Sequence, residues 1–210
     1  MMDTTRRDVQ EIDVARAELW QIMADGPNVL WSNAGRDVYL WNADRRVIEN
    51  LSADGPATHQ WSAFIRGDYV VWMDQRDTPG ASEAAPNNPE VYLLHLPTRT
   101  LRRITNDPPE RPAGQGYPSL AGDWVLWSDF RNAREPNPPR WFTDRMELWG
   151  YHIPTGITEP IVQGAIQLDL SHDYGDGVIT ANCRDYDGET GSSTQLRAAI
   201  EVLFPAVRDQ

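Results

Sequence analysis

Short apolar runs, each opened by a turn and closed by a polar residue, occur four times along this chain. The clearest copies are Gly122–Arg131 (GDWVLWSDFR) and Gly67–Arg76 (GDYVVWMDQR), and the weaker ones are Gly26–Gly35 (GPNVLWSNAG) and Gly175–Arg184 (GDGVITANCR). Apolar runs of this length between turn residues are typical of strands that are buried on both faces. The pattern therefore predicts a repeat protein built from β-strands.

Each copy belongs to a longer unit of roughly 40 to 55 residues, a period typical of propeller blades made of four short strands. The second unit shows the plan most clearly, and we name its predicted strands A, B, C and D in chain order. They are Gln60–Ile65, Tyr69–Asp74, Glu90–Leu96 and Leu101–Thr105. The first unit repeats them at Leu19–Met23, Asn28–Asn33, Asp37–Asn42 and Arg46–Leu51, and the third at Tyr117–Leu120, Trp124–Asp129, Met146–Ile153 and Ile157–Val162.

The fourth unit is predicted to lack its D strand. Its A, B and C strands are expected at Ile166–Leu170, Val178–Asn182 and Ile200–Phe204, although Gln195–Val202 also has the composition of a short helix. The N-terminal segment Arg6–Ile12 aligns with the D strands of other units and is expected to supply the missing strand. Such a pairing would hide sheet edges that otherwise promote aggregation.

The prediction is an all-β fold, a closed propeller of four blades with four antiparallel strands each, in which the N-terminal strand closes the last blade. The blades span about residues 16–52, 57–106, 112–163 and 165–205, with 5–13 completing the last. The competing interpretation is a fragment of a ring with more blades.

Composition supports this fold class and limits the partners. The chain has 210 residues, of which 40% are hydrophobic, with 9 Trp and 7 Tyr, and aromatic residues favour strands. A formal net charge of -12 argues against nucleic acid and anionic membranes as partners. A single cysteine, Cys183, excludes an intrachain disulfide and a cysteine-based zinc site.

The N-terminus shows no apolar region of a secretory signal, and no apolar stretch is long enough to span a membrane. As written, the chain would be cytoplasmic, unless a targeting segment has been removed. The sequence alone leaves the compartment unknown.

Pro118–Asn132 (PSLAGDWVLWSDFRN), together with strands such as Val91–Leu96 and the following Arg102–Asn106, resembles the TolB-like propeller repeat. The resemblance covers nearly the whole chain. It implies a rigid disc, found in bacterial periplasmic and cell-surface proteins, that mostly binds proteins or glycans. Some relatives are enzymes, such as oligogalacturonate lyases and prolyl peptidases that carry a propeller.

Polar residues that recur by repeat are interpreted as structural. His95 and His152 end C strands, with Asn42 as their first-unit counterpart, and an acceptor at this position can bond backbone N–H groups of the next turn. Side chains two apart on a strand share a face, so a polar pair there can tie the strand end to its neighbour. Such pairs end the B strands: Asp74 and Arg76, Asp129 and Arg131, Asn182 and Arg184.

Residues that the units do not share point to a binding face. The B–C loops are long and unrelated in sequence, at Asp77–Pro89, Asn132–Asp144 and Asp185–Ser193. In a propeller they leave from one rim, whereas the opposite rim has only tight turns. Insertions confined to one face indicate binding there, although long surface loops are also tolerated at little cost.

The B–C loop Asn132–Asp144 contains the clearest candidates for partner binding. Trp141 and Phe142 form an aromatic pair that can stack on a sugar or anchor a protein, or else form the loop's own small core. The charged candidates beside them are Arg134, Arg140 and Asp144.

No cofactor is predicted, with calcium as the one weak candidate. Asp185 and Asp187 precede Gly188 as in a fragment of a calcium loop, but a solvated hairpin is the favoured interpretation. No catalytic motif is present. The leading hypothesis is therefore a non-catalytic propeller that holds a protein or glycan on the B–C loop face. The alternative is a glycan-active lyase or hydrolase with acids converging on the axial channel.

Overall fold

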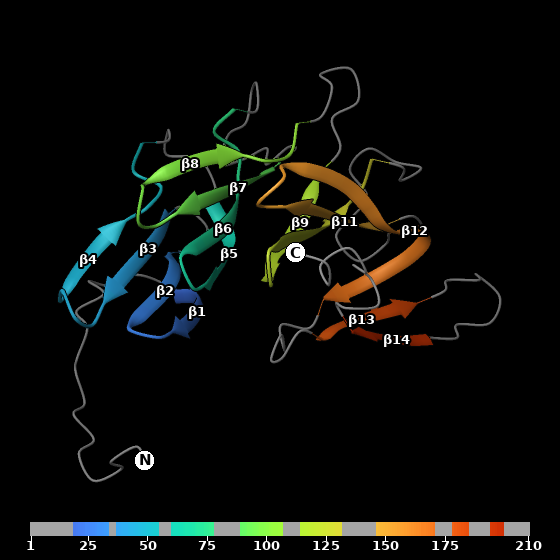
Figure 1. Ribbon diagram of the computed structural model, residues 1–210, viewed down its shortest axis with the longest axis horizontal. Helices are drawn as coiled ribbons and strands as arrows, with labels where there is room; N and C mark the ends of the chain where they lie inside the picture. The colour runs from blue at the N-terminus through green and yellow to red at the C-terminus, as the bar shows by residue number, and fades with distance from the viewer. Residues whose placement is uncertain are drawn as a thin grey trace, which may run out of the picture.

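The structure is a computed structural model and describes residues 19–33, 37–54, 60–77, 89–106, 114–131, 146–170, 178–184 and 194–199 (Figure 1). From residue 162 onward only the backbone of these strands is described. The described residues form fourteen strands and no helix, which confirms the all-β class. Within them, no helix is present that could cross a membrane.

Two antiparallel sheets of four strands match the first two predicted units. The first sheet runs in the order β1 (Leu19–Asp25), β2 (Asn28–Asn33), β3 (Asp37–Asn42) and β4 (Val47–Asn50). The second runs β5 (Gln60–Arg66), β6 (Tyr69–Asp74), β7 (Glu90–His95) and β8 (Thr100–Arg103). The bounds of β2, β3 and β6 match the predicted ones, and the bounds of the other strands differ from them by one or two residues.

The third unit forms β9 (Gln115–Ala121), β10 (Trp124–Asp129), β11 (Met146–His152) and the start of β12 (Ile157–Leu170). Separate strands were expected at Ile157–Val162 and Ile166–Leu170, and this expectation is wrong because β12 contains both. Residues 163–165 are Gln, Gly and Ala, and none of them is a proline that would remove a backbone hydrogen bond of the sheet. The pairing with β11 absorbs the extra length through irregular register around Leu148.

β12 therefore joins the third and fourth units into one six-stranded sheet, which continues through β13 (Val178–Arg184) to β14 (Thr194–Ala199). The third strand of the fourth unit thus begins at Thr194, earlier than the predicted Ile200. Residues 195–199 are strand, not helix. Residues 200–204 and 6–12 lie outside the described residues, so the count of four blades and the closure by the N-terminal strand stay predictions.

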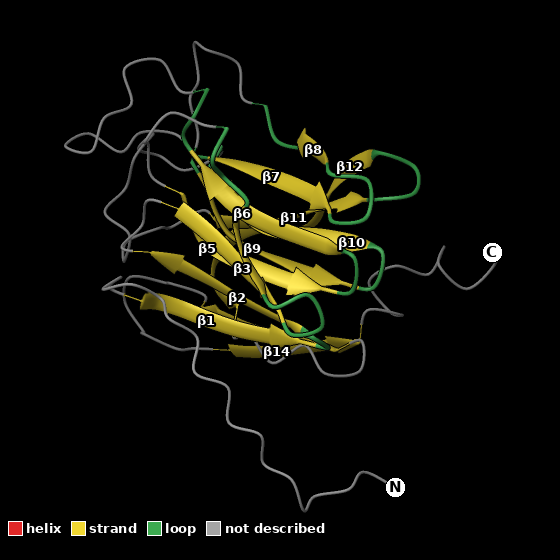
Figure 2. Ribbon diagram, turned by 90° about the vertical axis from the view of Figure 1, so that its left-hand side faces the viewer, coloured by secondary structure: helices red, strands yellow, loops and turns green. Residues whose placement is uncertain are grey.

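The sheets are arranged around a common centre, with β1, β5 and β9 nearest to it and β4 and β8 at the periphery (Figure 1). Successive sheets pack face to face, as the side view in Figure 2 shows. Two buried apolar clusters hold the three sheets together. One joins Leu30, Val38 and Leu40 of the first sheet to Val70 and Trp72 of the second. The other joins the second sheet to β9, β10 and β11.

The tight turns follow one backbone pattern in the first three units. Gly67 and Gly122 link A to B strands at φ of 53° and 54°, where a residue with a side chain would be strained. The C–D turns place Arg46 and Arg99 at φ of 54° and 57°, and Gly156 stands at the equivalent position. The repeat therefore fixes the turn geometry even where the residue is not glycine.

Candidate functional site

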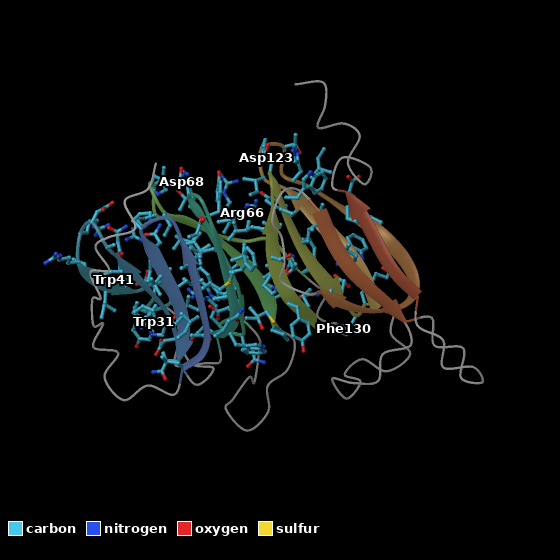
Figure 3. All side chains as sticks on the ribbon, turned by 90° about the horizontal axis from the view of Figure 1, so that it is seen from below. Trp31, Trp41, Arg66, Asp68, Asp123 and Phe130 are labelled. Carbon is cyan, nitrogen blue, oxygen red and sulfur yellow. The ribbon has the colours of Figure 1, made fainter. Side chains whose placement is uncertain are left out.

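The ends of the B strands and the beginnings of the C strands lie at one rim of the disc. Asp74 pairs in register with Glu90, and Asp129 pairs with Glu147, so the B–C loops leave from this rim. In Figure 3, Phe130 lies at the opposite edge of the sheets from Asp68 and Asp123, which belong to the A–B turns. The two rims are therefore distinct, one with long loops and one with tight turns.

At the end of β10, Asp129 is the centre of a polar clamp. Its carboxylate accepts hydrogen bonds from Trp127 Nε1 at 3.1 Å, from the Arg131 backbone N–H at 3.0 Å and from the Arg131 guanidinium at 2.7 Å. The guanidinium carbon lies 3.9 Å from the centre of the Trp149 ring on the next strand. Asp129 is fully buried, so this clamp fixes the chain where the loop leaves the sheet.

The second sheet has the same clamp. Asp74, also fully buried, accepts from Trp72 Nε1 at 3.0 Å and from the backbone N–H and Nε of Arg76, each at 2.8 Å. The Arg76 guanidinium carbon lies 5.0 Å from the centre of the Tyr92 ring. The arginine thus binds its own strand and covers the aromatic residue of the neighbouring strand. Asn182 and Arg184 stand at the corresponding positions of β13, where the backbone alone is described.

A further set of polar residues at this rim was not identified from the sequence. Glu90, 1% exposed at the start of β7, accepts from the Thr105 hydroxyl at 2.6 Å and from the Arg103 guanidinium at 2.5 Å. Thr105 in turn accepts from the Val91 backbone N–H at 2.8 Å. This bond joins β7 to a residue two positions beyond the end of β8.

The same arrangement recurs in the first sheet, where the Val38 N–H donates to the Ser52 hydroxyl at 3.1 Å and that hydroxyl contacts Asp37 at 3.4 Å. In the third sheet Glu147 accepts from Trp149 Nε1 at 2.9 Å. In the first three units an acid stands at the first or second position of the C strand and is followed by an apolar and then an aromatic residue, and this was the signal in the sequence.

Tyr92 links the second clamp to the first residue of the B–C loop. Its hydroxyl donates to Asp77, which also lies 3.7 Å from the Arg103 guanidinium. Burial, and then the hydrogen bond and negative charge of Asp77, raise the pKa of Tyr92 well above its usual range. Burial and the neighbouring Asp37 raise the pKa of Tyr39, its counterpart in the first sheet. Both phenols are therefore held neutral as hydrogen-bond donors.

The two histidines lie on the rim with the tight turns. His95 Nδ1 is 2.8 Å from the Thr98 hydroxyl, and its ring packs on Tyr69 with centroids 4.9 Å apart. His152 makes the same contacts with Thr155 at 2.8 Å and with Trp124 at 4.8 Å. The partner is a threonine side chain and not the expected backbone N–H.

Asn42, the first-unit counterpart of the histidines, does accept from a backbone N–H, that of Arg45, at 2.9 Å. All three side chains thus contact the turn that follows their strand. None of them lies at the rim with the long loops.

The predicted partner-binding residues Arg134, Arg140, Trp141, Phe142 and Asp144 lie outside the described residues, as do the calcium candidates Asp185 and Asp187. The structure describes the bases of their loops. Among the residues that it does describe, no three His, Cys, Asp or Glu side chains are grouped to hold a metal ion. The described carboxylates Asp74 and Asp129 are both bonded to residues of their own strands.

Stacked antiparallel sheets around a common centre, each with its first strand innermost, define a β-propeller. No family model and no curated protein matches this sequence. Comparison with solved structures does give matches. The TolB candidate from Agrobacterium tumefaciens is 12% identical with a TM-score of 0.53, over 83% of this chain and 63% of that one.

Two further structures are similar at the level of the fold. The computationally designed protein Ika4 is 10% identical with a TM-score of 0.55, over 90% of this chain and 96% of that one. An acylaminoacyl peptidase from Pyrococcus horikoshii is 11% identical with a TM-score of 0.53, over 87% of this chain and 32% of that one. The chain thus spans less than two thirds of the TolB candidate and about a third of the peptidase. The protein has a TolB-like propeller fold, as the sequence predicted.

Proposed function

We propose that this protein is a non-catalytic binding propeller that holds a protein or a glycan on the rim with the B–C loops. The observation that carries the proposal is the contrast between the two rims. One has turns of fixed backbone geometry, whereas the other has long loops unrelated in sequence that leave from buried clamps such as those of Asp74 and Asp129. Repeat proteins commonly bind partners through variable loops that a rigid scaffold holds in place.

The clamps support this division of roles. Each ties the first residues beyond a B strand to a buried carboxylate, so variation in the loop does not disturb the sheet. Loop aromatic residues then supply contact area, because their rings are large and lose little rotamer freedom on binding. Trp141 and Phe142 are the proposed anchors, with Arg134, Arg140 and Asp144 as their polar surroundings.

The test is a double variant, Trp141→Ala with Phe142→Ala, assayed on an array of acidic and neutral glycans and for thermal unfolding. We expect glycan capture to fall at least tenfold while the melting temperature stays within about 2 °C of the parent value. Ile157→Ala is the control, because Ile157 is 56% exposed and lies on the opposite rim. A large loss of stability with unchanged capture would show that the two rings form a loop core.

The alternative, a glycan-active enzyme, needs acids on the inner strands around the axis. The inner strands of the first three units carry three titratable residues, Asp25 on β1, Arg66 on β5 and Tyr117 on β9. Asp25 accepts the backbone N–H of Gly67 at 2.5 Å. The inner part of β12 adds Asp169, of which the backbone alone is described. Among the described side chains of the first three inner strands there is no pair of carboxylates, which favours the binding proposal. Turnover of a panel of acidic and neutral polysaccharides would reverse this preference.

We also propose that the ring has four blades and that residues 6–12 complete the last one as its D strand. The support is the alignment of this segment with β4 and β8, which are the outermost strands of their sheets. Deletion of residues 1–13 should lower the melting temperature and expose a sheet edge. An unchanged melting temperature would contradict this pairing.

A further inference from the structure

One position on the rim with the long loops differs between the first unit and the next two. In the second and third units the clamp arginine covers an aromatic ring of the C strand. The guanidinium of Arg76 lies 5.0 Å from the centre of Tyr92, and that of Arg131 lies 3.9 Å from the centre of Trp149. The first unit has Gly35 at this position. Because glycine has no side chain, the first unit does not supply this guanidinium from its own clamp position.

The aromatic surface that the arginine covers is nevertheless present in the first sheet. Trp31 pairs with Tyr39 in the register in which Trp72 pairs with Tyr92. The rings of the first pair stack with centroids 5.7 Å apart at 14°, and those of the second pair with centroids 6.4 Å apart at 18°. Figure 3 shows Trp31 near the edge of the sheets that carries Phe130. The ring of Tyr39, which is partly exposed, is therefore held as the arginine-covered ring of the second sheet is held.

The acid beside this ring has no cationic partner among the described residues. Asp37 stands two residues before Tyr39 on β3, so their side chains share a face of the sheet. Its carboxylate accepts hydrogen bonds from neutral groups, among them the Tyr39 hydroxyl at 3.4 Å and the Asn50 amide at 3.1 Å. Its counterpart in the second sheet, Glu90, pairs with Arg103, and Asn50 stands at the position of that arginine. The first sheet thus keeps the acid and the ring but has neither arginine.

We propose that Asp37 and Tyr39 form a binding site for a guanidinium group, supplied by an arginine side chain of a protein partner. The ring offers a cation–π contact and the carboxylate a charge-assisted hydrogen bond, and a planar guanidinium can make both. The net charge of -12 attracts a basic partner. The proposal rests on the proposed use of this rim for binding, and it names the chemical group that the first sheet binds there.

The guanidinium position lies at the edge of the sheet packing. Trp72 is fully buried, yet Arg76 at the end of the same row keeps 11% of its side chain exposed, and Arg131 keeps 36%. An arginine at this position is therefore accommodated while the rest of the sheet face is covered. A partner can reach the corresponding position of the first sheet from the rim.

The test is an NMR titration of the isotope-labelled protein with the peptide acetyl-Gly-Arg-Gly-amide. The same peptide with citrulline, which has a similar shape but no charge, should bind about tenfold more weakly. Asp37→Asn keeps an acceptor oxygen for Asn50 but removes the charge, and it should weaken the arginine peptide about fivefold. Tyr117→Leu is the control, because Tyr117 is 43% exposed on β9 outside the first sheet, and it should bind as the parent does. Equal binding of both peptides, or no effect of Asp37→Asn, would overturn the proposal.

A second variant rebuilds the clamp in the first unit. Asn33→Asp combined with Gly35→Arg supplies the acid and the arginine of the other units, so the protein's own guanidinium should cover Tyr39 and reduce peptide binding at least about tenfold. Asn33→Asp combined with Gly35→Gln adds a long side chain without a charge and should retain binding. Undiminished binding by the rebuilt clamp would overturn the proposal even if the other variants were unstable.

Two further arms identify the source of the guanidinium and separate this site from the loop anchors. Free L-arginine should bind at least about threefold more weakly than the peptide, because the acidic protein repels its carboxylate. Equal or tighter binding of L-arginine would assign the site to a small molecule and overturn the protein partner. The double variant Trp141→Ala with Phe142→Ala should bind the peptide as the parent does, whatever its effect on glycan capture. Loss of peptide binding in that variant would place the peptide at the loop anchors and overturn this site.

Discussion

Arg131 and Trp149, on neighbouring strands of the third sheet, are in direct contact, with the guanidinium carbon 3.9 Å from the ring centroid. The same guanidinium forms an ion pair with the buried Asp129. One arginine therefore both neutralises an acid and covers an indole where a long loop begins. The recurrence of this arrangement at Arg76 shows that the loop bases are made rigid by the same residues in successive blades.

Asp129→Ala is expected to destabilise the protein by roughly 2–4 kcal/mol, because it leaves the buried Trp127 N–H without its acceptor and the arginine without its counter-charge. The free energy of unfolding, from chemical denaturation, is the measurement. Asp123→Ala, at an exposed turn position, should change it by less than about 0.5 kcal/mol. Similar values for the two variants would mean that the clamp contributes no stability.

Thr105→Val keeps the shape of the side chain but removes the hydroxyl that serves both Val91 and Glu90. We expect a loss of roughly 1–3 kcal/mol, since a buried N–H and a buried carboxylate each lose a partner. Thr105→Ser retains the hydroxyl and should recover most of the loss. The free energy of unfolding of both variants is measured by chemical denaturation. A Thr105→Ser variant no more stable than Thr105→Val would contradict this account.

Gly150→Ala is expected to cost roughly 1–3 kcal/mol by overpacking. A Cβ there would lie 2.9 Å from Trp124 Cε3 and 3.1 Å from Ile161 Cδ1, which is too close for either to avoid moving. Gly114→Ala is the matched control, because its Cβ would meet neighbours at ordinary distances of 3.8 and 3.9 Å. Thermal unfolding of the pair should separate them clearly, and equal melting temperatures would refute the steric argument.

The raised pKa of Tyr92 makes stability depend on alkaline pH. The folded state favours the neutral phenol, whereas an unfolded tyrosine ionises near pH 10. The contribution is therefore complete below about pH 10 and is lost as the pH rises beyond that value. Unfolding measured between neutral and strongly alkaline pH should show a smaller decline for Tyr92→Phe than for the parent protein. An identical decline in both would contradict the assignment.

Much of the fold was predictable because its signals are local. The Gly-containing turns and apolar runs located β2, β6 and β10 with their observed bounds, since a strand buried on both faces is marked by every residue in it. The acid–arginine pairs were located from their recurrence alone. The hydrogen bonds from Trp72 and Trp127 to these acids were not predicted. The sequence places each indole two residues before the acid but does not show that its N–H is directed at the carboxylate.

Other features depend on which strands become neighbours. Glu90 and Thr105 are fifteen residues apart and meet because β7 pairs with β8, so neither stands out when the chain is read in order. The continuous β12 was missed for a related reason. Whether an extended segment bends between two sheets or bridges them is decided by the strands on either side.

The sequence by itself determined the repeat, the strand content and the separation of a long-loop rim from a tight-turn rim, because these follow from short-range turn chemistry and apolar periodicity. Only the tertiary structure decided which face of each sheet is covered and which buried acid each donor reaches. Those outcomes depend on the packing of blades that lie far apart in the chain. Ile22 on β1 is 59% exposed whereas its counterpart Ala63 on β5 is 2% exposed, a difference that the sequence of either strand does not reveal.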